Sequence, residues 1–334
     1  MNDNYIIEVK DLQKIYKVNQ RDKSGIGAAF KTLFKRDYKI VEAVANISFH
    51  IQPGEIRGFI GPNGAGKSTT IKILSGVLYP SSGEVDVMGY TPWLDRETLV
   101  KRIGVVFGQK SQLWWDLPAI DAFHLNKMIY EIPDKTFKDN LDYFISALNI
   151  EDVVKKPVRQ LSLGERMKCE FVCALLHEPP LVFLDEPTIG LDIYSKEAIR
   201  TYIKKINKDK GTTFIVTTHD LGDIEDLCKN ITVINNGTIT FDDSLENLKK
   251  YFTKKKIIDI TFSQAVDPED LKDYNIKSFN DISASIEINL EENNLREEIY
   301  KMWGALPVID LNINNISIEE VIKSIYDKKL SHTG

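Results

Sequence analysis

A glycine-rich segment between an apolar strand and an amphipathic helix limits the fold of this chain more than any other feature. Gly61-Pro-Asn-Gly-Ala-Gly-Lys67-Ser68 has the spacing G-x-x-x-x-G-K-[ST]; it follows an expected strand at 55–60 and opens an expected helix at 67–76. Glycines in such a loop let backbone N–H groups surround a phosphate, and the helix N-terminus adds a favourable dipole. The sequence therefore predicts a nucleotide-binding α/β domain.

Two side chains of this segment have separate expected tasks. Lys67 is expected to reach the β- and γ-phosphates of the nucleotide, and the Ser68 hydroxyl to coordinate Mg²⁺. The alternative, a glycine turn that happens to contain Lys-Ser, is disfavoured by the strand–loop–helix context. The predicted nucleotide contacts of this region are Gly61, Pro62, Asn63, Gly64, Ala65, Gly66, Lys67, Ser68 and Thr69.

Two acidic residues end a second apolar strand. The strand 181–184 is followed directly by Asp185 and Glu186. Because open α/β sheets bind ligands at the carboxyl ends of their strands, this pair is expected beside the phosphates. Asp185 is predicted to hold Mg²⁺ through water, and Glu186 to orient and deprotonate the attacking water.

Composition narrows the class of protein and its compartment. The 334 residues hold 43 Lys and Arg against 49 Asp and Glu, a formal net charge of −6, which argues against a general nucleic-acid binder. Three cysteines without paired spacing fit a reducing compartment. No secretory signal pattern and no apolar run long enough to span a bilayer is visible, so we expect a chain in the cytoplasm.

The order of the expected elements predicts two domains. Expected strands, among them 5–9 and 47–51, alternate with expected helices, among them 165–176, through the first part, which indicates an α/β domain with a largely parallel sheet over 1–248. A helical subdomain is expected at about 110–165. A basic stretch near 250 precedes a small α+β domain, expected at 255–334, and the boundary is placed near 245–255. The expected elements of this domain are strands at 257–262, 284–290 and 308–311 and helices at 295–303 and 318–326.

Further segments resemble a known family. Leu161-Ser-Leu-Gly-Glu165 resembles the signature motif of ABC-transporter ATPases, usually Leu-Ser-Gly-Gly-Gln, with Leu163 and Glu165 as departures. Tyr16 matches the adenine-stacking aromatic, Gln109 the Q-loop and His219 the switch histidine, all in the family's order. The resemblance implies a P-loop NTPase of ABC type, most like the branch of drug, antibiotic and sodium exporters. It also implies nucleotide contacts from Tyr16, Gln109, Ser162, Gly164, Glu165 and Asp192, Mg²⁺ ligation by Ser68, Gln109 and Asp185, and catalytic roles for Glu186, His219 and Lys67.

The same resemblance implies partners and a place in the cell. Two copies, or this chain and a related ATPase, are expected to form a head-to-tail dimer that clamps ATP between the Lys67 loop of one and the Ser162 turn of the other. Separate integral-membrane permease subunits would hold the ATPase at the cytoplasmic side of the cell membrane. A polysaccharide or teichoic-acid exporter ATPase is the alternative within transport, and an ABC ATPase acting in assembly the alternative outside it.

Three features leave two interpretations each. Residues 17–40 form a basic insertion whose apolar face suggests contact with membrane or permease, or packing on its own domain. Trp114 and Trp115 either pack in the helical subdomain or line a groove for a partner. Cys169, Cys173 and His177 share one helical face, for which core packing is favoured over a metal site.

Overall fold

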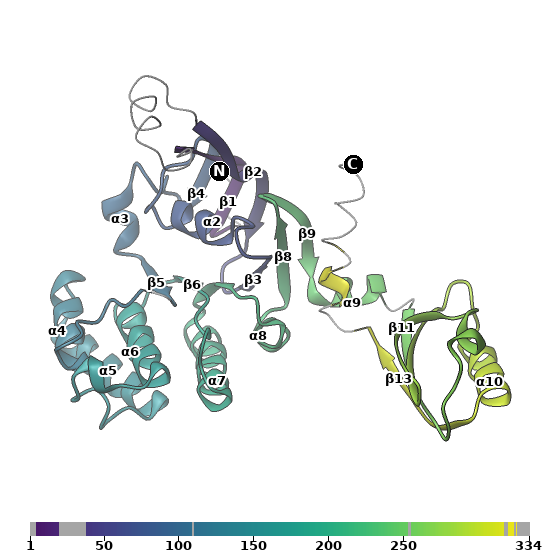
Figure 1. The fold of residues 1–334 in the computed structure, drawn as a ribbon. Helices are drawn as coiled ribbons and strands as arrows, with labels where there is room; N and C mark the ends of the chain where they lie inside the picture. Colours follow the sequence, from purple (N-terminus) through teal and green to yellow (C-terminus); the bar gives the residue numbers. More distant parts are fainter. Residues whose placement is uncertain are drawn as a thin grey trace, which may run out of the picture. The chain divides into compact units, whose positions relative to one another are not determined.

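The computed structural model divides into two compact units, Met1–Asp242 and Asp243–Gly334 (Figure 1). The division falls a few residues before the expected boundary and inside the last strand of the large sheet, Thr238–Ser244, whereas the lysine-rich stretch begins in the helix that follows. The structure describes residues 5–19, 38–108, 110–252, 255–316, 320–323 and 325.

A six-stranded sheet forms the centre of the larger unit, in the order β5-β6-β7-β3-β8-β9. β3 runs parallel to β7 and β8, and β6 parallel to β5 and β7, which confirms the largely parallel sheet. Parallel strands align their carboxyl ends at one edge, so the loops that follow β3, β5, β6 and β7 meet there. The strands are β3 (Ile56–Ile60), β5 (Ile103–Phe107), β6 (Leu181–Asp185), β7 (Thr213–Thr217), β8 (Asn230–Asn235) and β9 (Thr238–Ser244).

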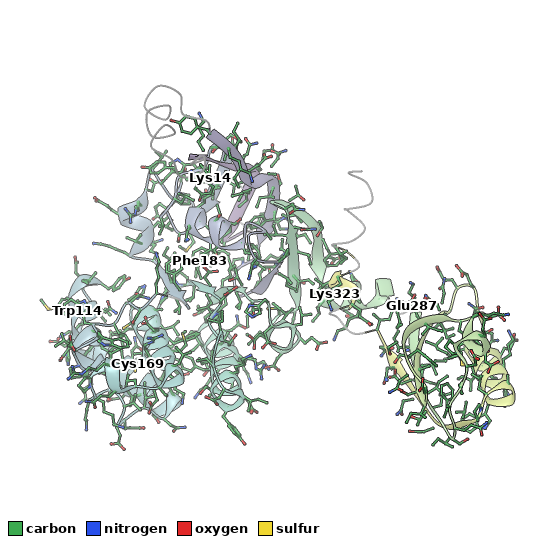
Figure 2. The ribbon with its side chains drawn as sticks, viewed as in Figure 1. Lys14, Trp114, Cys169, Phe183, Glu287 and Lys323 are labelled. Atoms are coloured by element: carbon green, nitrogen blue, oxygen red, sulfur yellow. The ribbon has the colours of Figure 1, made fainter. Side chains whose placement is uncertain are left out.

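A three-stranded antiparallel sheet, β2-β1-β4, packs on the same core. Its strands are β1 (Ile7–Asn19), β2 (Tyr38–Ile51) and β4 (Ser82–Val87). β1 and β2 are longer than the expected strands at 5–9 and 47–51, and pair from Ile7↔Ile51 to Asn19↔Tyr38. Residues 17–19 and 38–40, the two ends of the predicted insertion 17–40, therefore belong to the paired strands β1 and β2. The remainder of the insertion lies outside the described residues. Phe183 of β6 lies fully buried in the centre of the unit (Figure 2).

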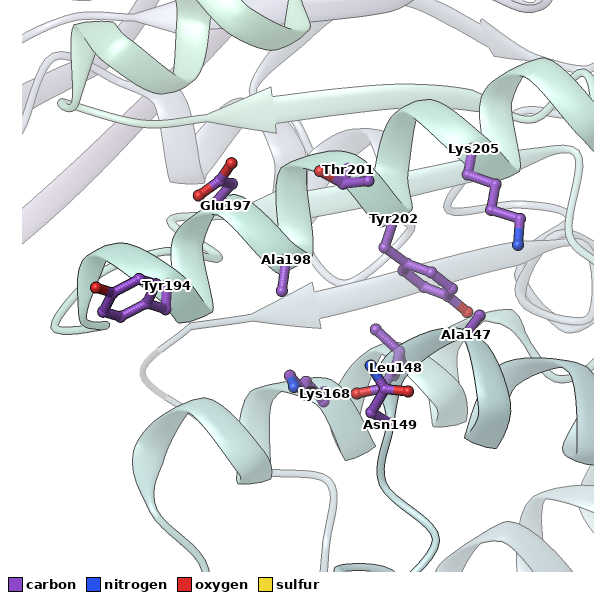
Figure 3. Close-up of a pocket in the computed structure, with 10 residues that line it drawn as sticks. All are labelled: Ala147, Leu148, Asn149, Lys168, Tyr194, Glu197, Ala198, Thr201, Tyr202 and Lys205. Carbon is purple, nitrogen blue, oxygen red and sulfur yellow. Dashed lines mark hydrogen bonds between the residues drawn. The ribbon is translucent and has the colours of Figure 1, made fainter.

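Helices α4, α5 and α6 gather into a helical group (Figure 1). A groove of about 380 Å³ separates α5 and α6 from α7, and Figure 3 shows Tyr202 of α7 reaching toward them. The buried Tyr202 ring meets Phe144 and Phe171 edge-on at 6.1 and 6.2 Å, so aromatic packing joins the group to α7. The helices of this unit are α2 (Lys67–Leu74), α3 (Arg96–Val100), α4 (Ala119–Ile129), α5 (Asp134–Leu148), η1 (Val158–Gln160), α6 (Leu163–Leu175), α7 (Ile193–Lys210) and α8 (Leu221–Leu227).

The smaller unit contains a four-stranded antiparallel sheet, β11-β12-β10-β13, with α10 packed on one face. Ile258 and Ile286 from the sheet and Met302 from α10 are fully buried, which gives this α+β unit its own apolar core. β11 was not expected from the sequence, and the helix expected at 318–326 lies partly outside the described residues. The elements are α9 (Leu245–Phe252), β10 (Lys255–Phe262), η2 (Pro268–Leu271), β11 (Asn275–Asn280), β12 (Ser283–Asn289), α10 (Leu295–Ala305) and β13 (Val308–Asn315).

Cys169 and Cys173 are buried in α6, as the core interpretation predicts. Burial raises the pKa of the Cys169 thiol to about 12 and that of Cys173 well above its usual value, so both thiols stay protonated. His177 stacks on Tyr130 with 3.9 Å between ring centroids, and its Nε2 lies 3.1 Å from the Ile103 carbonyl oxygen. Burial lowers the pKa of His177 to about 4, so its ring is neutral at physiological pH.

The depressed pKa of His177 predicts an acid-labile fold. In the unfolded chain His177 has a pKa near 6.5, so between pH 6.5 and 4 it binds a proton there but stays neutral in the folded protein. The free energy of unfolding therefore falls as the pH drops through this window. The loss should reach about 2 kcal/mol at pH 5. Denaturant unfolding at pH 7.5 and 5 should show a smaller difference for His177→Gln than for the parent. An equal pH dependence in both proteins would contradict the assignment.

Candidate active site

The phosphate-binding loop is fixed by its surroundings on two sides. Gly66 caps the N-terminus of α2 with φ of 111°, and a Cβ at this position would overlap the Ala43 carbonyl of β2. Only glycine combines this left-handed backbone with so close an approach. On the other side, the Gly237 N–H donates to the Ala65 carbonyl at 2.9 Å, and the Ala45 N–H donates to the Gly237 carbonyl at 2.8 Å. These contacts fix the backbone of the loop, which leads directly into the N-terminus of α2.

Lys67 is buried and folded over this loop. Its Nζ donates to the carbonyl oxygens of Gly61 at 2.7 Å and Pro62 at 3.1 Å. Burial lowers the pKa of Lys67, while the nearby Glu186 and Asp185 oppose the shift. A desolvated ammonium beside a helix N-terminus is well suited to neutralise a phosphate.

A hydroxyl and a carboxylate meet at the carboxyl end of β6. Ser68 Oγ donates to Asp185 Oδ1 at 2.9 Å, and Thr217 Oγ1 donates to the same oxygen at 2.6 Å. Mg²⁺ prefers such hard oxygen ligands and is usually held by one or two protein groups together with substrate phosphates. The donor set of Ser68 and Asp185 therefore fits Mg²⁺.

Glu186 and His219 face each other across the same edge. His219 Nδ1 lies 3.5 Å from Glu186 Oε1; the Glu186 side chain is mostly buried, while the His219 side chain is 57% exposed. Glu186 has a φ of 54°, a costly value for a residue with a Cβ. Its N–H donates to both the carbonyl and the hydroxyl oxygen of Thr217 at 3.0 Å. The carboxylate is thereby presented beside the phosphate-binding loop, where it can orient and deprotonate a water molecule.

Ser68, Asp185, Glu186 and His219 line one pocket of about 670 Å³, whereas Lys67 is buried behind the loop and does not line it. The pocket brings together the phosphate-binding loop, Asp185, Glu186 and His219, which lie far apart in the sequence. It also contains Lys72, which sequence reasoning missed although it follows Ser68 by one helical turn. The residues that line it are Gly61, Pro62, Asn63, Gly64, Ser68, Lys72, Val77, Phe107, Gly108, Lys110, Asp185, Glu186, Ile189 and His219.

The described residues that line this pocket do not include two other expected nucleotide contacts, Gln109 and Tyr16. Gln109 lies outside the described residues; its neighbours Gly108 and Lys110 line the pocket, and the Gly108 N–H donates to the Asp185 carbonyl at 2.8 Å. Tyr16 is half-buried on β1, where it pairs with Val41 of β2, and it does not line the pocket.

The segment that resembles the signature motif opens α6. The helix begins at Leu163, so the expected start at residue 165 is wrong, because Ser162 is its N-cap. Ser162 Oγ accepts from the Glu165 N–H at 3.2 Å, and Glu165 Oε2 accepts from the Ser162 N–H at 2.8 Å. This reciprocal capping lowers the pKa of Glu165. Gly164 therefore lies inside the first turn rather than before the helix.

The start of α6 packs against the start of α7. A Cβ on Gly164 would overlap the Ser195 side chain. Asp192 is the N-cap of α7, and its Oδ1 accepts the N–H groups of Tyr194 and Ser195 at 3.0 Å. Ser162, Gly164, Glu165 and Asp192 do not line the pocket of their own chain.

Trp114 and Trp115 lie a few residues beyond Gly108 and Lys110, which follow β5 and line the pocket. They are 56% and 57% exposed, so the interpretation that they pack in the core of the helical subdomain is wrong. Figure 2 shows Trp114 at the periphery of the helical group.

Comparison with known proteins now identifies the family. A family model described as ABC transporter matches residues 44–189. Over 213 residues the chain is 30% identical to the bacitracin transport ATP-binding protein BcrA of Bacillus licheniformis, covering 64% of this chain and 68% of the relative. The chain belongs to the ABC transporter ATP-binding family. The expected family membership and the expected resemblance to the exporter branch are both confirmed.

Further relatives agree with an ABC-type ATPase. The chain is 34% identical to ABC transporter A family member 8 of Dictyostelium discoideum over 237 residues, 71% of this chain but only 28% of that protein's length. The solved ATP-binding cassette MJ0796, a dimer in a post-hydrolysis state with bound ADP and Pi, superimposes with a TM-score of 0.59 at 26% identity; the match covers 72% of this chain and 98% of the cassette. Among the helices that the structure describes, none has the length and apolar character that crossing a bilayer demands.

Proposed function

We propose that this chain binds and hydrolyses ATP with Mg²⁺ and thereby powers export of a substrate through a separate membrane permease. The observation that carries the proposal is the convergence of the Ser68–Asp185 pair and the Glu186–His219 pair in one pocket, which is also lined by the loop residues Gly61 and Pro62 that Lys67 holds. Lys67 neutralises the β- and γ-phosphates, and Ser68 and Asp185 hold Mg²⁺ together with Gln109. When bound, Mg²⁺ supplies positive charge to the phosphate oxygens.

The chemical step follows from the two side chains at the carboxyl edge. Glu186 accepts a proton from the water that attacks the γ-phosphate, and its mostly buried carboxylate is held at the edge of the pocket beside His219. The His219 ring, beside Glu186 Oε1, contacts the γ-phosphate and orients the water. Tyr16 stacks on the adenine from β1.

A second copy of the chain, or a related ATPase, completes the site. Ser162 and Gly164 lie at the N-terminus of α6, where backbone N–H groups favour a phosphate, and they are absent from their own chain's pocket. Head-to-tail pairing brings this turn over the nucleotide of the partner, with Glu165 holding the turn and Asp192 lying beside it. The dimeric state of the related cassette supports this arrangement. Loss of the γ-phosphate then weakens the interface, which moves the permease.

The permease is proposed to hold the dimer at the cytoplasmic side of the membrane. Trp114 and Trp115 form an exposed apolar surface beside the segment that leaves the pocket, which favours a groove for a membrane subunit. The insertion 17–40 is proposed to touch the permease or the lipid surface. The similarity to BcrA, named as a bacitracin transport protein, favours an exporter over the polysaccharide-exporter and assembly alternatives.

Co-purification tests the partner directly. Affinity purification of the chain from cells lysed in a mild detergent should recover a polytopic membrane protein in a fixed ratio. Trp114→Ser with Trp115→Ser should reduce this recovery, while Trp303→Ser, an exposed tryptophan of the smaller unit, should leave it unchanged. Recovery of soluble partners alone would favour the assembly alternative and overturn the transport proposal.

A further inference from the structure

A buried carboxylate lies behind the two loops that carry Glu186 and His219. Asp223 of α8 is 1% exposed. Its Oδ2 accepts from the hydroxyl of Thr188, two residues after Glu186, and lies 3.4 Å from the hydroxyl of Thr218, the residue before His219. Thr188 and Thr218 are themselves 2% exposed. One carboxylate group thus contacts both loops from the side away from solvent.

The other oxygen of this carboxylate connects to α7. Asp223 Oδ1 accepts from Arg200 Nη1 at 3.1 Å, and Arg200 also pairs with Asp226, with 3.4 Å between Nε and Oδ2. A buried carboxylate is stable only when it is paired and hydrogen-bonded, so these partners hold one another in a fixed arrangement. α7 begins at Ile193, beside the Asp192 cap and the Gly164 turn.

Glu186 needs such support because of its backbone. Its positive φ is costly and persists only where the surrounding structure fixes it. On one side its N–H is held by Thr217. On the other side the chain turns at once, with the Ile189 N–H donating to the Glu186 carbonyl at 3.3 Å, and Thr188 is the residue of that turn that is anchored to Asp223.

We propose that Asp223 and Thr188 are positioning residues that fix the Glu186 carboxylate relative to the His219 ring. The proposal rests on the catalytic roles assigned above to Glu186 and His219. Neither Asp223 nor Thr188 lines the pocket, so neither touches nucleotide there. Their loss leaves the phosphate-binding loop, which lies on β2 and α2, unchanged. Without these residues the Glu186 carboxylate and the His219 ring are no longer held in a fixed relative position. Small displacements of reacting groups lower the rate of the chemical step strongly.

The test is a split between turnover and nucleotide affinity. Thr188→Val keeps the shape but removes the hydroxyl, and kcat for ATP hydrolysis should fall about tenfold or more with KM for ATP within twofold. Thr188→Ser restores the hydroxyl and should restore most of kcat. If Thr188→Val does not fold, Thr188→Ala, which adds no apolar methyl beside the carboxylate, takes its place with the same expectation.

Two further variants separate the possible outcomes. Lys204→Met removes another ion pair between α7 and α8, the exposed Lys204–Asp226 contact, and should leave kcat unchanged. Glu186→Gln, measured in parallel, must lose hydrolysis if the assigned base is right. Full kcat in folded Thr188→Val or Thr188→Ala alongside an inactive Glu186→Gln overturns the positioning proposal alone. An active Glu186→Gln overturns the assigned base instead.

Discussion

Glu186→Gln should bind ATP, form the closed dimer and then stall. The amide keeps the size of the carboxylate and can still bond to His219, but it cannot accept a proton from water. Loss of a general base should lower kcat by about 10²- to 10⁴-fold, while the phosphate contacts from Lys67 and the loop persist. Phosphate release measures the first effect, and size-exclusion chromatography with ATP measures the second.

The same substitution at the opposite end of β6 supplies the control. Glu178 precedes the strand, is half-exposed and pairs with Lys210, so Glu178→Gln should hydrolyse ATP at the parental rate. Normal turnover by Glu186→Gln would show that another group is the base. A Glu186→Gln protein that stays monomeric with ATP would count against the head-to-tail clamp.

The phosphate-binding loop was predictable because its chemistry is local in sequence. Gly66, Lys67 and Ser68 are adjacent, and each role follows from a spacing that only a strand–loop–helix unit uses. Asp185 and Glu186 were predictable for a related reason, since four apolar residues deliver them to the carboxyl edge of a parallel sheet.

The parts that were missed depend on contacts between distant segments. β1 and β2 continue past the expected strands through Lys14, Lys17 and Glu42, where cross-strand pairing outweighs a polar sequence. The hydrogen bond between Thr188 and Asp223 joins residues 35 positions apart, and no sequence spacing predicts it. The early start of α6 could have been recognised, because Ser162-x-x-Glu165 is the pattern of a capping box.

Lys67→Met should abolish tight nucleotide binding without unfolding the protein. The methionine keeps the apolar stem but removes the charge and the two bonds to the loop carbonyls. A lost charge-assisted contact to phosphate is worth about 1.5–3 kcal/mol, so the dissociation constant of ATP should rise about tenfold to a hundredfold or more. Calorimetric titration with MgATP measures the change, and Lys101→Met, an exposed lysine paired with exposed Glu131, should bind as the parent does.

The stability of Lys67→Met then distinguishes a lost ligand contact from a lost fold. Burial lowers the pKa of Lys67 because the charged ammonium loses its hydration in the folded protein. At neutral pH, where Lys67 is charged, this desolvation lowers the free energy of unfolding. Replacing it by a neutral side chain relieves that cost, which offsets the two lost bonds to the loop carbonyls, so without nucleotide the variant should melt close to the parent. Added MgATP should raise the melting temperature of the parent and not that of the variant. A variant stabilised by MgATP as strongly as the parent would show that Lys67 does not contact the phosphates. A variant that melts well below the parent would show that Lys67 is needed to hold the loop.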